Sequence, residues 1–248
     1  MHHTNRLACA ALAALCCLLA LPAMAAEAPQ FVWNASGAPL NLQIEPQWPG
    51  MHGAMDPFEA ALKRDGPAPR GWTAVSLITP AGGTFPALAP TGGLVRWQPG
   101  DISRVAVVHN PDPKDRLNLR RLPDVKSASR GKYYSGTVVT VLTRRDDGWA
   151  QVSIRGYRGW MRAEYLRFDT LPEAKANAIP TGYVKAVKGG VLQLQLNPYY
   201  GHNVGKYEAG TPARILGLTG GWAHVYMPNG QAGFIEIKNL DVPGGLRP

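Results

Sequence analysis

The sequence has no cysteine beyond its first twenty residues. Cys9, Cys16 and Cys17 are its only thiols, and all three lie within residues 1–25, which we expect to be a cleaved signal peptide. A chain that begins at residue 26 contains no cysteine. Disulfides, cysteine nucleophiles and Cys-ligated zinc are then excluded as sources of stability or chemistry.

Long hydrophobic runs are also missing. The apolar run from Leu7 to Leu21 has about 15 residues, fewer than the ~20 that a membrane-spanning helix needs, and no later segment is apolar for long enough. Arg6 precedes the run and Ala23-Met24-Ala25 follows it, the small-x-small pattern that signal peptidase cleaves. A membrane anchor is the alternative interpretation. We expect a periplasmic or secreted protein with no transmembrane segment after cleavage.

The common catalytic motifs are absent too. Four histidines follow residue 25, at His52, His109, His202 and His224, and each is isolated from the others in the sequence. There is no His-Glu-x-x-His, no Gly-x-Ser-x-Gly and no phosphate-binding glycine loop. We therefore predict no catalytic residues, no metal site and no cofactor, in a protein that is not an enzyme. A hydrolase whose site is assembled only by folding stays open as an alternative.

The sequence does have enough apolar material for packed cores. Of its 248 residues, 45% are hydrophobic and 17% are charged. Glycine and proline are frequent, with 28 and 22 residues, and show no Gly-X-Y period. This excess indicates many tight turns between short strands and argues against long helices. The composition therefore favours an all-β fold.

The charge is positive and unevenly distributed. The chain carries a formal net charge of +9, and residues 112–170 alone hold 13 basic and 7 acidic side chains. For an exported protein, lipid or wall phosphates and acidic murein peptides are better counterparts for this charge than nucleic acid. The alternative is that the charge serves solubility alone.

An internal repeat spans the second half of the chain. Leu117-Asn118-Leu119-Arg120 matches Leu192-Gln193-Leu194-Gln195, and Gly148-Trp149-Ala150 matches Gly221-Trp222-Ala223. Across the repeat the offsets stay between 73 and 75 residues, which predicts two copies of one small domain. Short apolar alternations such as 149–154, separated by glycine-containing turns, predict about five strands in each copy, closed into a small β-barrel.

The first copy resembles a known family. Residues 117–166 contain, in order, Leu-Asn-x-Arg, a proline turn, Gly-Thr-x-Val, Gly-Trp-x-x-Val and Gly-Trp-x-x-x-x-Tyr-Leu, a pattern similar to the bacterial SH3 (SH3b) domain. The resemblance implies a five- to six-stranded SH3-like barrel, found in exported proteins that often adhere to the cell wall. The second copy departs from the pattern where Gln195, Phe234 and Asn239 replace Arg120, Trp160 and Tyr165.

We therefore predict tandem small SH3-like barrels after a signal peptide and a β-rich or irregular N-terminal region. The expected boundaries are the signal peptide at 1–25, the N-terminal region at 26–101, a first barrel at 102–168, a linker at 169–180, a second barrel at 181–242 and a tail at 243–248.

The N-terminal region has two interpretations. Leu40-Asn41-Leu42-Gln43 and Gly71-Trp72 each precede their counterparts in the first copy by 77 residues, which favours a degenerate third copy. Residues 55–66 argue against it, because Asp56 as N-cap, Pro57 and Glu59 predict a short helix. A β-rich lead-in with this one short helix is the preferred interpretation.

Aromatic and arginine side chains gather in the first copy. Aromatic rings offer a ligand a rigid apolar surface, and arginine binds a carboxylate through two parallel hydrogen bonds. The candidate ligand-binding residues are Tyr134, Trp149, Tyr165, Arg120, Arg155 and Arg158. The alternative is that aromatic residues form the barrel's own core, as we expect for Tyr133 and Trp160.

These observations predict an exported, non-enzymatic SH3b protein that binds peptidoglycan or its stem peptides as a cell-wall adaptor. The alternative is a periplasmic protein-interaction module without affinity for the wall. The expected partner is therefore peptidoglycan or a periplasmic protein, and no nucleic acid.

Overall fold

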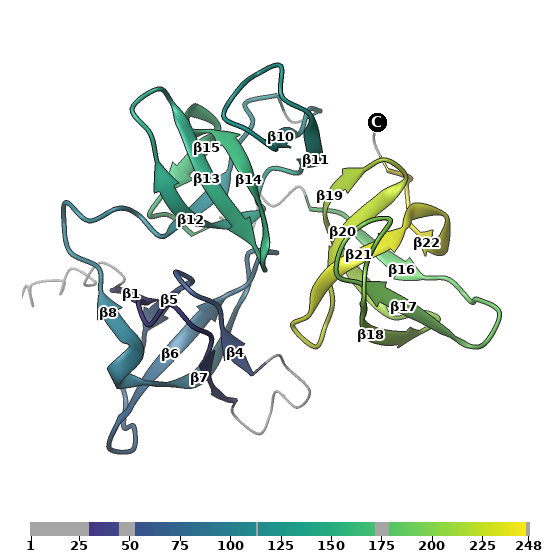
Figure 1. The fold of residues 1–248 in the computed structure, drawn as a ribbon. Helices are drawn as coiled ribbons and strands as arrows, with labels where there is room; N and C mark the ends of the chain where they lie inside the picture. Colours follow the sequence, from purple (N-terminus) through teal and green to yellow (C-terminus); the bar gives the residue numbers. More distant parts are fainter. Residues whose placement is uncertain (1–29, 45–52, 113, 172–178, 247–248) are drawn as a thin grey trace, which may run out of the picture.

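The computed structural model describes residues 30–44, 53–112, 114–171 and 179–246, which form strands, turns and three short 3₁₀ helices. The predicted all-β fold is confirmed. Figure 1 shows three groups of strands, which follow one another along the chain and which we name the N-terminal, middle and C-terminal units. The predicted signal peptide at 1–25 lies outside the described residues. Within them, no helix is long and apolar enough to cross a membrane.

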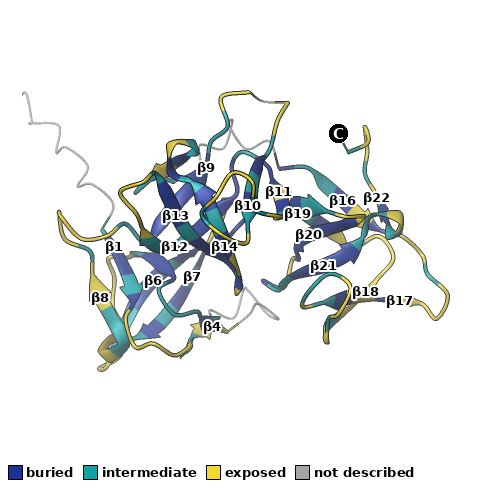
Figure 2. Ribbon diagram, turned by 45° about the horizontal axis from the view of Figure 1, so that its top comes forward, coloured by how far each residue is buried: buried dark blue, intermediate teal, exposed yellow. Residues whose placement is uncertain are grey.

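The middle unit contains seven strands of an antiparallel sheet. They are β9 (Val105–Val108), β10 (Leu117–Arg120), β11 (Ser129–Tyr133), β12 (Val138–Arg144), β13 (Trp149–Ile154), β14 (Tyr157–Arg162) and β15 (Leu166–Phe168). Their order in the sheet is β15-β9-β12-β13-β14-β10-β11. Side chains alternate between the two faces, so that Leu117 and Leu119 of β10 are buried while Asn118 and Arg120 are half-exposed. Figure 2 shows most residues of the long strands as buried or intermediate and many loop residues as exposed.

The C-terminal unit has the same strand order. Its strands are β16 (Thr181–Val184), β17 (Val191–Gln195), β18 (Asn203–Glu208), β19 (Pro212–Thr219), β20 (Trp222–Tyr226), β21 (Ala232–Glu236) and β22 (Leu240–Asp241). They pair in the order β22-β16-β19-β20-β21-β17-β18. An irregularity in register also recurs, between Leu119 and Arg120 in β10 and between Leu194 and Gln195 in β17.

The N-terminal unit repeats much of this arrangement. Its strands are β1 (Phe31–Asn34), β2 (Leu40–Asn41), β3 (Gln43–Ile44), β4 (Ala54–Met55), β5 (Ala60–Lys63), β6 (Trp72–Ile78), β7 (Thr84–Pro90) and β8 (Leu94–Arg96). The order is β3-β7-β6-β5-β1-β8, and β2 pairs with β4. This strand order matches that of the middle unit if β2 and β3 together correspond to β10 and β4 corresponds to β11.

A short 3₁₀ helix precedes the last strand of every unit. These helices are η1 (Thr91–Gly93), η2 (Ala163–Tyr165) and η3 (Ile237–Asn239). The first N–H of each donates to the carbonyl of the glycine before the unit's tryptophan strand, Gly71, Gly148 or Gly221, over 2.9 Å. The three units therefore share local hydrogen bonds as well as strand order.

The predicted helix at 55–66 is wrong, because the chain makes a turn there and continues as β5. The N–H of Asp56 does donate to Oε2 of Glu59 over 2.7 Å, as a helix cap would require. Phe58, however, has a φ of 65°, which ends any helical turn. Its N–H donates to the carbonyl of Asn34, and β5 then pairs with β1 and β6. Sheet pairing and burial thus override the local capping signal.

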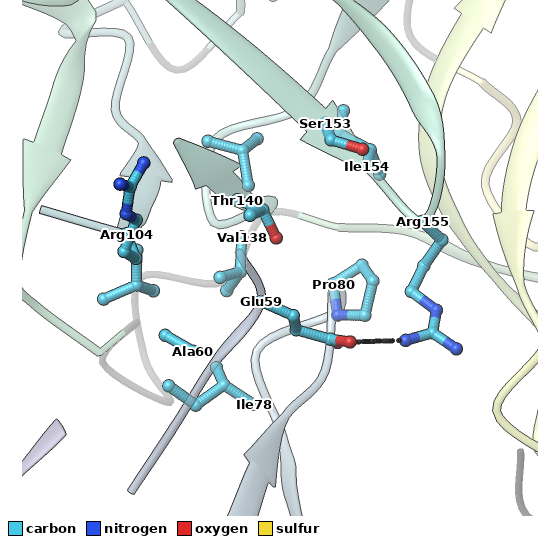
Figure 3. A pocket seen from close by; sticks show the side chains of 12 residues that line it. Glu59, Ala60, Ile78, Pro80, Arg104, Val138, Thr140, Ser153, Ile154 and Arg155 are labelled. Carbon is cyan, nitrogen blue, oxygen red and sulfur yellow. Dashed lines mark hydrogen bonds and ion pairs between the residues drawn. The ribbon is translucent and has the colours of Figure 1, made fainter. Parts of the chain in front are cut away.

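The N-terminal and middle units meet across a buried apolar cluster. Phe31, Ala60 and Ile78 from the first pack with Val105, Val107 and Val138 from the second. An ion pair extends this contact: Nη1 of Arg155 donates to both carboxylate oxygens of Glu59, over 3.0 and 2.9 Å. Figure 3 shows the Arg155 side chain extended toward Glu59 beside a cavity of about 20 Å³. Burial raises the pKa of Glu59, and the Arg155 guanidinium partly opposes this rise.

The middle and C-terminal units are joined by strand pairing. Lys132 and Tyr133 of β11 pair with Leu218 and Gly217 of β19 in antiparallel register. The hydroxyl of Tyr133 lies 2.9 Å from Nδ1 of His224, and both residues are almost fully buried. Burial lowers the pKa of His224 to about 3 and raises that of Tyr133. The imidazole of His224 is therefore neutral at ordinary pH, and its Nδ1 shares a hydrogen bond with the Tyr133 hydroxyl.

We expect the free energy of unfolding to decrease in mild acid, because His224 is buried and neutral. Its pKa is about 3 in the folded chain and near its ordinary 6.5 when unfolded, so protons bind the unfolded chain more tightly between these values. The contribution of neutral His224 to the free energy of unfolding is complete above pH 6.5. Below pH 6.5 this contribution falls by about 1.4 kcal/mol per pH unit. Urea unfolding should show a loss of about 2 kcal/mol between pH 7.5 and 5.0 from this group. His224→Gln should flatten the pH dependence by that amount, and an unchanged slope would contradict the assignment.

The Glu59–Arg155 pair predicts a second effect on stability. Arg155→Gln leaves a buried carboxylate without its counter-charge, which should lower the free energy of unfolding by about 3 kcal/mol at pH 7 in urea titrations. Arg158→Gln removes the same charge from an exposed position and should change the free energy by less than about 0.5 kcal/mol. Equal effects of the two substitutions would refute a role of Arg155 in joining the units.

Candidate functional site

A groove of about 410 Å³ lies on the middle unit, and we name it the middle groove. Three of the sequence-predicted residues line it: Arg120 at the end of β10, Trp149 at the start of β13 and Tyr165 in η2. Trp149 is only 4% exposed, so it forms the floor, while Arg120 and Tyr165 are half-buried. The structure thus brings together residues that lie up to 45 positions apart in the sequence.

Two further arginines, which the sequence interpretation missed, line the middle groove. Arg162 lies opposite Trp149 in the β13–β14 register, and its guanidinium carbon is 5.4 Å from the centre of the indole ring. Arg116 precedes β10 and lies two and four residues before Asn118 and Arg120, the half-exposed positions of that strand. Strand alternation from Arg120 and the hairpin register of Trp149 are the signals that would have found them.

The guanidinium groups around the groove differ in how they are held. Nε of Arg162 donates to Oε1 of Glu164 over 3.0 Å, and Nη1 of Arg120 donates to the carbonyl of Ser127 over 2.8 Å. Arg116 lies over the ring of Tyr134, 5.3 Å from its centre. Nη1 of Arg116 and the Tyr134 hydroxyl are buried and have no hydrogen-bond partner among the described residues. Buried polar groups without a hydrogen-bond partner are costly.

The other three predicted residues lie outside the groove lining. Tyr134 is 9% exposed, and its N–H donates to the carbonyl of Leu216 in the C-terminal unit. Arg155 is held by Glu59 at the junction with the N-terminal unit. Arg158 is exposed on β14. Of the two aromatic residues expected in the core, Tyr133 is buried at 1% exposure, whereas Trp160 is half-exposed with Arg145 over its ring.

The corresponding place in the C-terminal unit has different chemistry. Trp222 stands where the middle unit has Trp149, but Gln195 and Glu236 replace the arginines 120 and 162. The ring of Tyr199 packs edge-on against Trp222, with 5.9 Å between centres. Its hydroxyl donates to the carbonyl of Gly220 over 2.8 Å. A side chain of the same unit therefore covers this tryptophan.

The site offers planar cations and an indole floor for binding a ligand. Among the described residues, no group of three or more His, Cys, Asp or Glu side chains could hold a metal ion. Guanidinium groups bind carboxylates through paired hydrogen bonds, and a tryptophan floor supplies apolar contact. The chemistry that the groove supports is recognition of a carboxylate-bearing ligand.

One curated relative matches about half of the chain. It is "Putative N-acetylmuramoyl-L-alanine amidase YrvJ" of Bacillus subtilis (strain 168), 28% identical over 123 residues. The match covers 48% of this chain and 24% of the relative, so the chain spans about a quarter of the relative's length. The prediction that this protein is not an enzyme is overturned by this finding, since the relative is named for a hydrolase.

Solved structures with low overall similarity also match, among them the following three. NlpC2 from Trichomonas vaginalis is 18% identical, and the match covers 56% of this chain and 48% of NlpC2, with a TM-score of 0.26. NlpC1 from the same organism is 10% identical, and the match covers 86% of this chain and 91% of NlpC1, also with a TM-score of 0.26. An NlpC/P60 endopeptidase from Photobacterium damselae subsp. piscicida is 16% identical, covers 56% of this chain and 33% of its own, and gives 0.23. Scores this low carry no argument about fold or function.

A family model matches the part of the chain that forms the middle groove. The model describes the bacterial SH3 domain and matches residues 115–167, a range that includes Arg116, Arg120, Trp149, Arg162 and Tyr165. Residues 115–167 are a bacterial SH3 domain.

Proposed function

We propose that the middle groove binds the stem peptides of peptidoglycan and that the protein acts at the cell wall as a periplasmic or secreted protein. The observation that carries this proposal is the position of the groove, inside the segment that matches the bacterial SH3 domain. Stem peptides carry free carboxylates, which are suitable partners for the guanidinium groups of Arg116, Arg120 and Arg162. The floor of Trp149 and the ring of Tyr165 supply apolar contact beside them.

The neighbouring units are, we infer, further SH3-like units. The C-terminal unit shares the strand order and the register irregularity of β10, and all three units share the hydrogen bond from the 3₁₀ helix to a glycine carbonyl. The middle unit differs from the C-terminal one in keeping arginines beside its tryptophan, where the C-terminal unit has Gln195, Glu236 and the ring of Tyr199. Wall binding is therefore assigned to the middle unit.

Hydrolysis of peptidoglycan amide bonds is the second candidate function. The observation in its favour is the name of the Bacillus relative. An alternative to wall binding is a protein-interaction module of the periplasm, in which the same groove takes the carboxylates of a protein partner. Measurements with purified sacculi and with periplasmic extract separate these possibilities.

Co-sedimentation with dye-labelled sacculi tests the proposal. The wild-type chain should pellet with sacculi at about 0.15 M salt, where charge attraction alone is largely screened. Arg116→Gln and Tyr165→Ala should each weaken binding about tenfold, because each removes a contact of the groove. Arg158→Gln, which makes the same charge change outside the groove, should bind like the wild type. Dye released into the supernatant would reveal hydrolysis in the same tubes.

Two outcomes would contradict binding by the middle groove. An equal loss in Arg116→Gln and Arg158→Gln would mean that net charge alone holds the protein to sacculi. No sedimentation of the wild type, together with capture of a partner from periplasmic extract that Arg116→Gln abolishes, would favour the protein-interaction module instead.

A further inference from the structure

A second groove, of about 440 Å³, lies between the middle and C-terminal units, and we name it the inter-unit groove. One side is formed by Arg121 and Arg130 of the middle unit, and the other by Asn197, Tyr199 and Tyr200 of the C-terminal unit. It exists because β11 pairs with β19, which places the loops after β10 and β17 near one another. Neither unit forms it alone.

The two tyrosines are unusually available. Tyr200 is 92% exposed and Tyr199 is 58% exposed, although large aromatic side chains are generally well covered in folded proteins. Tyr199 is also held in place, since its hydroxyl donates to the Gly220 carbonyl and its ring packs against Trp222. Its φ of 73° is uncommon for a non-glycine residue and is a feature that clusters at binding sites. The side chain of Tyr199 is thus held by two contacts, whereas that of Tyr200 is almost fully exposed to solvent.

The charge on the lining has one sign. Arg121 is exposed and Arg130 half-buried, and none of the lining residues is acidic. The guanidinium of Arg130 lies over the ring of Tyr157, 4.5 Å from its centre, which fixes its plane. Planar guanidinium groups match carboxylates in a bidentate geometry, which lysine cannot do. Asn197 adds an amide that can both donate to and accept from a peptide backbone.

We propose that the inter-unit groove is a second binding site, for an acidic peptide. Carboxylates of the peptide bind Arg121 and Arg130, and its extended backbone lies across the rings of Tyr199 and Tyr200. The site is distinct from the middle groove: Arg120 lines the middle groove and Arg121 lines the inter-unit groove, so the two open on either side of the segment that follows β10. This proposal does not depend on the function assigned to the middle groove.

Fluorescence anisotropy with labelled tetraglutamate tests the proposal, with labelled tetraglutamine as the uncharged control. The full chain should bind tetraglutamate and not tetraglutamine at about 0.15 M salt. The titration is repeated in an Arg116→Gln background, in which the middle groove is weakened, and binding of tetraglutamate should persist there. In that background Arg130→Gln and Tyr200→Ala should each weaken binding about tenfold.

Two matched variants control for charge and for loss of a tyrosine. Arg158→Gln makes the same charge change as Arg130→Gln, and Tyr183→Ala removes another exposed tyrosine of the C-terminal unit, which is 41% exposed and outside the groove lining. Both should bind tetraglutamate like the parent. Thermal melting should show that every variant is folded.

Three results would overturn the inter-unit site. The first is loss of tetraglutamate binding when Arg116→Gln is the only substitution. The second is that the controls Arg158→Gln and Tyr183→Ala weaken binding as much as Arg130→Gln and Tyr200→Ala do. The third is displacement of the labelled peptide by inorganic pyrophosphate at a lower concentration than by unlabelled tetraglutamate. Sedimentation with sacculi reports on the middle groove, so failure of one proposal is seen separately from failure of the other.

Discussion

The pairing of β11 with β19 determines how the second half of the molecule is built. The free edge of a strand is prone to unwanted pairing. Here the edge strand β11 pairs with the part of β19 that lies beyond its pairing with β16. The contact is close enough that residue 217 must be glycine, because a Cβ there would lie 2.8 Å from the Lys132 carbonyl oxygen and from the Tyr133 ring. Once the strands are paired, Tyr133 reaches His224, and the loops that line the inter-unit groove face one another.

The same strand order supports different surfaces in the three units. In the middle unit, arginines surround the groove above Trp149. In the C-terminal unit, Tyr199 lies against the corresponding Trp222 and the arginines are replaced. In the N-terminal unit, Glu59 lies directly before β5 and forms an ion pair with Arg155 of the middle unit. The backbone hydrogen bonds recur, while the side chains line a groove in the middle unit, cover a tryptophan in the C-terminal unit and form an ion pair at the junction of the N-terminal unit.

Much of the fold followed from local pattern. The alternation of buried and half-exposed residues in β10 and the turn glycines before the tryptophan strands are recorded in short stretches of sequence, and so the strands were predictable. The helix at 55–66 was not correctly predicted. A cap formed by Asp56 and Glu59 is a local signal, whereas the pairing of β5 with β1 and β6 depends on segments far away, and long-range pairing outweighs a capping bond.

The sequence by itself determined the all-β class, the bacterial SH3 pattern and three of the six ligand-binding candidates, Arg120, Trp149 and Tyr165, which line one groove. Only the tertiary structure decided the place of Arg155, which pairs with Glu59, and of Tyr134, which lies against the C-terminal unit. It also decided that Tyr199 and Tyr200 share a groove with Arg121 and Arg130. The reason is physical, since residue type and periodicity specify which face of a strand a side chain occupies, but not which distant strand or unit covers that face.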